Sequence, residues 1–423
     1  MYPNPQDVVH LPFRASLEQY EEQANDLVNA CTSGAPGAIR GWAARWPAQA
    51  DAIARFAQDM LAGSDCPLSG AQSVVARVHG FESWSTFSAH LEDLARAGSP
   101  ASYFEAAAEA IIAGDAAALE KLLREHPQLA RARSTREHRA TLLHYVAANG
   151  VENYRQRTPA NAVQIAEILL DAGAEVDAEA DMYDGGCTTL GLAATSIHPE
   201  LAGVQNPLMQ TLIDRGAVID KPRGAGRTHS FVNGCLANGR AAAAEYLASH
   251  GARVDLDGAA GIGRLDLVTG FFDPVSALKP PATDEQVRAG FVWACEFGRT
   301  AVVEFLLDRG VPPDARHDGI TGLHWAALGG HTAIVSLLLD REARVNAVEE
   351  RYNGTPLTWA LYGWNDPPIG TDRDRYYDVI ARLVRAGAEV NPDWIDDRAD
   401  HTPFANRLRA DARMRAALSG GGS

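Results

Sequence analysis

The feature that most constrains the fold of this chain is a short phrase that recurs six times. In each copy an apolar pair is followed by a glycine, or by Glu342 in one copy, and then by Asp or Asn. A glycine at a helix end makes left-handed backbone inexpensive, and Asp or Asn favours a turn. The six copies are Leu169–Asp177, Leu212–Asp220, Leu247–Asp255, Leu306–Asp314, Leu338–Asn346 and Leu383–Asn391. They predict a repeat array in which one helix after another ends in a hairpin.

A second recurring segment lies upstream of these phrases and predicts a partner helix in each repeat. Its copies are Thr141–Ala148, Thr188–Ala194, Thr321–Ala327 and Thr355–Leu361. Threonine can cap a helix through its hydroxyl. The pattern resembles the ankyrin repeat, which Asp318–Asn346 follows almost throughout, including Gly329-Gly-His331 between its helices. The resemblance implies an all-α fold, an ankyrin-repeat solenoid of helix pairs with β-hairpin turns, preceded by a small helical module.

The period of the repeat divides the chain into three expected parts. These are an N-terminal capping module at 1–100, an array at 101–418 and a flexible tail at 419–423. The expected repeats are 101–134, 136–177, 184–220, 224–255, 257–282, 287–314, 318–346 and 353–391, followed by a C-terminal cap at 401–418. In the repeat at 257–282 the hairpin is expected to be lost.

The first hundred residues predict helices near 16–31, 38–62, 70–79 and 84–97, two of them with capping boxes. The boxes would be Ser16–Gln19 and Ser69–Gln72. The stretch Ala71–Phe87 resembles the helical leader that precedes ankyrin repeats in many bacterial proteins, which implies a bacterial origin. Because the end of an array exposes an apolar face, we expect this module to cover it.

Three insertions interrupt paired helices, at Val151–Ala160, Ser196–Asn206 and Tyr362–Tyr376. Loops of this length are either functional or tolerated. They decide whether the inner face of the array is an open groove or a closed pocket.

Charge and cysteine content exclude several classes of function. Thirty-eight basic residues against 54 acidic ones give a net charge of −16, which repels nucleic acid and anionic membranes. No signal peptide or membrane-spanning run is apparent. The five cysteines form no zinc spacing and are expected to be reduced, in a cytoplasmic protein. We expect no metal and no cofactor. Gly258–Gly263 resembles a dinucleotide loop only superficially, because no strand precedes it.

Most histidines have an expected structural role. His144 and His324 occupy the position at which the ankyrin family ties a hairpin to a helix, and His331 is a turn histidine. His317 differs because it adjoins Asp318 on a hairpin, where ankyrin proteins usually contact ligands.

An aromatic row is the most informative candidate site. Alignment of the repeats places Tyr145, Leu192, Trp293, Trp325 and Trp359 at one position, directly after the histidine. Glu296 follows Trp293 by one helical turn. The expected neighbours are Tyr183, Asp184, Asp318 and Tyr352 on hairpins, and Tyr362 and Trp364 beside the row. The indoles either pack against the next repeat or line an aromatic, acid-rimmed groove.

Three functions remain open on this reading. The first is a recognition scaffold for a protein or peptide with basic residues. The second is a binder of a flat or cationic small molecule. The third is a cofactor-independent acid–base enzyme, with Glu296, His317 and Asp318 as candidate catalytic residues.

Overall fold

The structure is a computed structural model that describes residues 7–12, 15–221, 230–274, 277–368, 370–394 and 402–420. Residues 421–423 of the tail expected at 419–423, the start of the repeat at 224 and the start of the C-terminal cap at 401 lie outside these residues. The chain divides into two compact units, 1–231 and 232–423, called here the first and the second unit.

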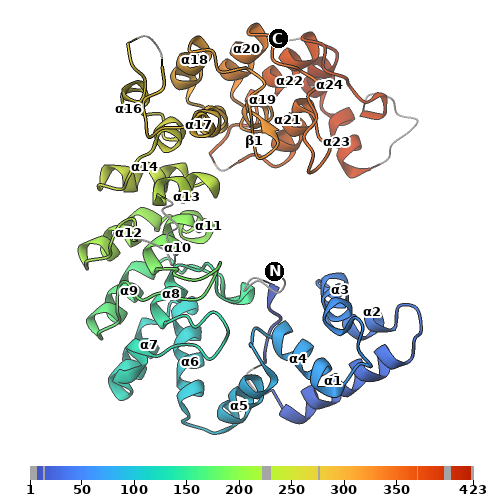
Figure 1. Ribbon diagram of the computed structural model, residues 1–423, viewed down its shortest axis with the longest axis vertical. Helices are drawn as coiled ribbons and strands as arrows, with labels where there is room; N and C mark the ends of the chain where they lie inside the picture. The colour runs from blue at the N-terminus through green and yellow to red at the C-terminus, as the bar shows by residue number, and fades with distance from the viewer. Residues whose placement is uncertain are drawn as a thin grey trace. The chain divides into compact units, whose positions relative to one another are not determined.

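The first unit begins with five helices and continues with paired helices (Figure 1). The N-terminal helices are α1 Leu17–Thr32, α2 Ala38–Ala43, α3 Ala50–Leu61, α4 Leu68–Val78 and α5 Trp84–Ala95. The repeats follow as α6 Pro100–Ala113 with α7 Ala116–Glu125, α8 Leu142–Val146 with α9 Ala162–Asp171, and α10 Thr189–Thr195 with α12 Gln205–Asp214. Between them lie η2 Pro127–Arg131, η3 Asn153–Arg155 and α11 Ile197–Leu201.

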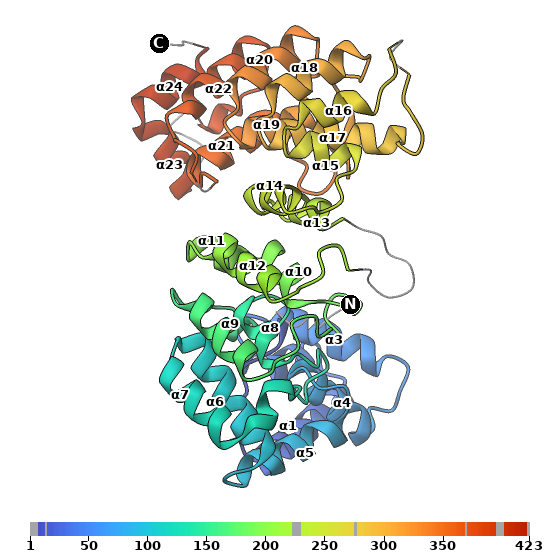
Figure 2. The ribbon, with the colours of Figure 1, turned by 90° about the vertical axis from the view of Figure 1, so that its left-hand side faces the viewer.

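The second unit consists of further helix pairs, in which α18, α20 and α22 form one layer and α17, α19 and α21 the other (Figure 2). Its pairs are α13 Phe231–Ala237 with α14 Ala241–Ser249, α15 Leu256–Gly261 with α16 Leu265–Gly270, α17 Asp284–Glu296 with α18 Thr300–Asp308, α19 Gly322–Leu328 with α20 Thr332–Asp340, and α21 Pro356–Asn365 with α22 Arg375–Arg385. η4 Pro392–Trp394, α23 Pro403–Ala410 and α24 Ala412–Leu418 complete it. This architecture confirms the expected fold class.

The hairpin turns of the repeat are short. Strands β1 Arg316–His317 and β2 Ile320–Thr321 pair antiparallel, with His317 opposite Ile320. Asp318 and Gly319 between them have φ values of 50° and 80°, the positive angles that a two-residue hairpin requires at both positions. The turn itself therefore accounts for an Asp-Gly pair at this place.

The recurring histidine of the motif connects successive repeats by hydrogen bonds, as expected. His324 Nδ1 lies 2.7 Å from Thr321 Oγ1, and its Nε2 lies 3.2 Å from the carbonyl oxygen of Gly354 in the next hairpin. His144 makes the same pair of bonds to Thr141 and to the carbonyl of Cys187. Burial lowers the pKa of His144 to about 4, so the ring is neutral and can accept at one nitrogen while it donates at the other.

Several expectations for the N-terminal helices are wrong. The single helix expected at 38–62 is two helices, because Pro47 cannot donate within a helix and disfavours helical backbone before it. Ser16 makes no cap bond, and α4 begins at Leu68, so that Ser69 lies inside it. The capping box is formed instead by Ser83 and Thr86 at the start of α5.

Cysteine pairing also differs from the expectation of reduced thiols. Cys31 at the end of α1 and Cys66 before α4 form a disulfide, with Cα atoms 6.2 Å apart. Cys187, Cys235 and Cys295 are free and buried. The two cysteines are 35 residues apart in the sequence, and no motif in the sequence indicates that they pair.

Candidate functional site

The predicted aromatic row exists on α17, α19 and α21 of the second unit. The rings of Trp325 and Trp359 meet edge to face with centroids 5.0 Å apart, and Trp293 meets the ring of His317 in the same way at 5.7 Å. Trp293 is only 8% exposed, whereas Trp325 and Trp359 are half-buried. Trp293 is therefore packed into the array, whereas the other two indoles remain partly exposed.

Two tyrosines extend the exposed part of this row. Tyr362 lies one helical turn after Trp359 on α21 and is 62% exposed, and Tyr352 on the preceding hairpin is 68% exposed. Gly354 lets that hairpin lie against Trp359, since a Cβ at residue 354 would be 2.8 Å from the indole nitrogen. We call Trp325, Tyr352, Trp359 and Tyr362 the aromatic face.

A buried carboxylate holds the hairpin that carries Tyr352. Glu349 is fully buried and accepts hydrogen bonds from the backbone N–H groups of Arg351, Tyr352 and Gly354. These bonds favour the charged form and lower its pKa, although burial opposes them. The aromatic face therefore rests on an ordered hairpin.

The three candidate catalytic residues are not joined into one site. His317 Nε2 lies 3.7 Å from a carboxylate oxygen of Asp318, whose side chain is 88% exposed. Glu296 neighbours Trp293 along α17, but among the residues that the structure describes its carboxyl has no hydrogen bond or ion pair with His317 or with any other group. Burial alone raises the pKa of Glu296 to about 8.

Two further residues expected to bind a ligand, Tyr145 and Trp364, are buried. Tyr145 is fully buried and donates to Glu152 Oε1 at 3.4 Å, so no ligand can reach it. Trp364 is 3% exposed, and the guanidinium groups of Arg373 and Arg407 lie 5.9 Å and 5.5 Å from its ring centroid. Both were expected at a ligand surface, and the packing of neighbouring segments overturns that.

Tyr183 and Asp184, two other expected ligand-binding residues, lie on a hairpin of the first unit. Tyr183 donates to Asn149 Oδ1 at 2.8 Å and is 40% exposed. Both residues have positive φ, 48° and 71°, which is a turn conformation. Leu192, at the row position of the same unit, is buried.

Sequence reasoning missed a buried charged cluster in the first unit. It consists of Glu105, Arg136, Glu152 and Arg155, with the exposed Glu109 at its edge. Arg155 binds Glu105 Oε2 at 2.6 Å and Glu109 Oε1 at 2.8 Å, and Arg136 pairs with Glu152. The insertion Val151–Ala160 supplies both Glu152 and Arg155, so it packs inward. Nothing in its sequence distinguishes these residues from a solvated loop.

This cluster attaches the N-terminal helices to the first repeats. Arg136 is 1% exposed, donates to the carbonyl of His79 at 2.9 Å and lies over the ring of Phe81 at 5.1 Å. The cations lower the pKa of Glu152 and of Glu105, while burial opposes that shift. The charges of the four buried members, Glu105, Glu152, Arg136 and Arg155, balance, which indicates a structural joint.

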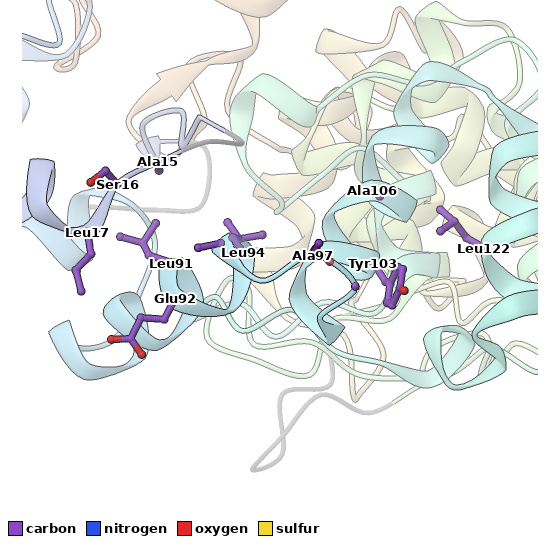
Figure 3. Close-up of a pocket in the computed structure, with 13 residues that line it drawn as sticks. Ala15, Ser16, Leu17, Leu91, Glu92, Leu94, Ala97, Tyr103, Ala106 and Leu122 are labelled. Atoms are coloured by element: carbon purple, nitrogen blue, oxygen red, sulfur yellow. The ribbon is translucent and has the colours of Figure 1, made fainter.

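The first unit also contains a cleft of about 820 Å³ between its N-terminal helices and α6 and α7 (Figure 3). Leu17 and Leu91 line one end, and Tyr103 and Leu122 the other. Its charged lining residue, Glu92, points away from the other labelled side chains. A binding pocket needs several convergent polar groups, so this cleft is a weak candidate site.

The described residues hold no group of three or more His, Cys, Asp or Glu placed to bind a metal ion. None of the helices in the described part of the chain is long and apolar enough to cross a membrane.

Comparison with known proteins identifies the repeats that carry the aromatic face. Residues 291–393 match the family described as ankyrin repeats (3 copies). The crystal structure of the human ASB11 ankyrin repeat domain is similar, with 18% identity, a TM-score of 0.34 and coverage of 67% of this chain and 99% of that one. No curated protein matches the sequence. Ankyrin repeats generally mediate interactions between proteins.

Proposed function

We propose that the second unit is a recognition scaffold that binds a protein or peptide with basic residues through the aromatic face. The observation that carries this proposal is the exposure of Tyr352 and Tyr362, 68% and 62%, beside the half-buried pair Trp325 and Trp359. Tyrosine and tryptophan supply large, rigid contact areas and are enriched at binding hot spots. Ring faces also attract cationic side chains.

Charge favours a basic partner. The chain carries −16 overall, and complementary charge speeds association and discriminates between partners. Asp318 adds an exposed carboxylate on the hairpin beside Trp293, because its partner His317 leaves the Asp318 side chain 88% exposed. An arginine-containing segment would find rings and carboxylates on the same repeats.

A binding assay with defined peptides tests the proposal. Pools of random peptides, each with one fixed residue, would be titrated against the protein while tryptophan emission is followed. We expect pools with fixed Arg or Lys to bind more tightly than pools with fixed Glu. Trp325→Ala should weaken binding of every pool about tenfold or more, as loss of a hot-spot residue does.

The control is Trp84→Ala, in an N-terminal helix of the first unit, which should bind like the unaltered protein. Unchanged affinity in Trp325→Ala would contradict the assignment of the aromatic face. Failure of every pool to bind would contradict peptide recognition itself.

The acid–base alternative rests on Glu296 alone. A catalytic acid and base must both come within hydrogen-bond reach of one substrate, and the candidate base His317 is engaged with Trp293 and Asp318. We therefore assign Glu296 to recognition, as argued next.

A further inference from the structure

Glu296 is partly shielded from water, and its carboxyl has no partner among the described residues. Glu296 is the last residue of α17, and its side chain is half-buried. Burying an ionisable group without a hydrogen bond or counter-charge is unfavourable. A glutamate at this place therefore needs an explanation beyond packing.

Its equivalents in the next two repeats show that the fold does not require it. The same position is occupied by Leu328 in α19 and by Tyr362 in α21. Leu328 is half-buried and Tyr362 is 62% exposed. An apolar side chain thus satisfies the repeat at this position, and the position opens toward the side on which the aromatic face lies.

Two basic side chains near Glu296, those of Arg299 in the same repeat and His331 in the next, bind groups other than its carboxyl. Arg299 donates to the carbonyl of Gly261 at 3.0 Å and pairs with Glu245. His331 Nε2 lies 2.8 Å from the backbone carbonyl of Glu296, not from its carboxyl, and burial lowers the pKa of His331. The carboxyl therefore lacks a counter-charge from its own repeats.

From this geometry we infer that Glu296 receives a guanidinium or ammonium group of the bound peptide and so selects a basic residue there. The inference rests on the proposed function and names the partner chemistry of that site.

Binding should release a proton. Burial raises the pKa of Glu296 to about 8 in the free protein, so the carboxyl is largely protonated at neutral pH. A bound cation stabilises the carboxylate and lowers that pKa. Affinity should then rise about tenfold per pH unit below pH 8 and level off above it.

Other titratable groups around α17 have partners of their own or, like Asp284, Glu285 and Arg288 of α17 itself, are exposed. On the elements that pack against α17 or lie beside it, they are Asp257 with Asn233 and Gln286, Arg299 with Glu245, Arg316 with the carbonyl of Val348, His317 with Asp318, His324 with Thr321, His331 with the carbonyl of Glu296, and Asp308 with Arg341, while Glu304 is exposed.

The test uses peptide pools in which the fixed residue is arginine or citrulline, its neutral isostere. The unaltered protein should prefer the arginine pool about tenfold or more. Glu296→Leu, which copies Leu328, should bind both pools alike, and Glu296→Gln should lose the pH dependence. Thermal unfolding verifies that both variants are folded.

The outcomes separate the two proposals. If the unaltered protein binds but Glu296→Leu keeps the same preference for arginine, the inference about Glu296 is wrong and the proposed function stands. If no pool binds the unaltered protein, the proposed function fails and the inference with it. Calorimetry in two buffers of different ionisation enthalpy should show proton uptake by the buffer with the unaltered protein and none with Glu296→Gln.

Discussion

Single residues at the helix ends show most directly how sequence sets backbone shape. Gly173, Gly216, Gly251, Gly310 and Gly387 all have φ between 87° and 94°. Glu342, which replaces this glycine in one copy, adopts φ 65° all the same. The repeat therefore imposes left-handed backbone on a side chain that disfavours it.

Glu342→Gly is expected to stabilise the second unit by about 1 kcal/mol, because it removes the left-handed penalty. The Glu342 side chain is exposed, so little packing is lost. Urea unfolding followed by circular dichroism measures the change.

The matched control is Gly310→Ala at the equivalent position. A Cβ there meets nothing within 4 Å, so only the backbone penalty remains, and a loss of about 1 kcal/mol is expected. Equal stabilities of Glu342→Gly and the unaltered protein would show that the helix end relaxes without strain.

Among the elements, the insertion Val151–Ala160 contributes most to the interior of the first unit. Its Glu152 and Arg155 complete the charged cluster with Arg136 and Glu105. Removing one member leaves one opposite charge buried without compensation, which costs more stability than the intact pair contributes.

Arg136→Met should therefore destabilise the first unit by about 3 to 5 kcal/mol. Hydrogen exchange at amides of α4, α6 and α8 should accelerate, whereas exchange in α19 and α21 should not. Arg40→Ala, which breaks an exposed pair with Asp51, serves as the control and should leave exchange unchanged. Slow exchange in Arg136→Met would mean that water replaces the lost cation.

At the scale of the whole molecule, both units contain buried histidines whose pKa values are lowered. In the first unit, burial lowers the pKa of His79, His90 and His144 to about 4 each. In the second unit His324 and His331 are shifted in the same direction. A histidine whose pKa is lowered by folding takes up a proton in the unfolded chain at a higher pH than it does in the folded protein.

The stability of the first unit should consequently fall as pH drops from about 6.5 toward 4, since the unfolded state takes up more protons in that window. Below about pH 4.5, protonation of Glu105 and Glu152, whose pKa values are lowered, should add a further loss. Urea unfolding at several pH values, with hydrogen exchange to separate the units, measures this. Unchanged stability of the first unit between pH 6.5 and pH 4 would contradict it.

Sequence alone determined the repeat of this protein. The cap glycines, the Thr and His positions and the Asp318-Gly319 turn are local patterns, whose physics acts within a few residues, and they predicted the helix pairs and the hairpins. The same alignment found the aromatic row, because equivalent positions of a repeat share a face.

Only the tertiary structure decided what each equivalent position does. Tyr145 and Trp325 occupy the same place in the repeat, yet Tyr145 is buried beside Glu152 and Trp325 keeps an open edge. Trp364 is covered by arginines from other segments, and Glu152 and Arg155 of an apparent loop are internal. Burial and counter-charge depend on neighbours distant in the chain, which a local pattern does not contain, and these neighbours left Glu296 without a partner.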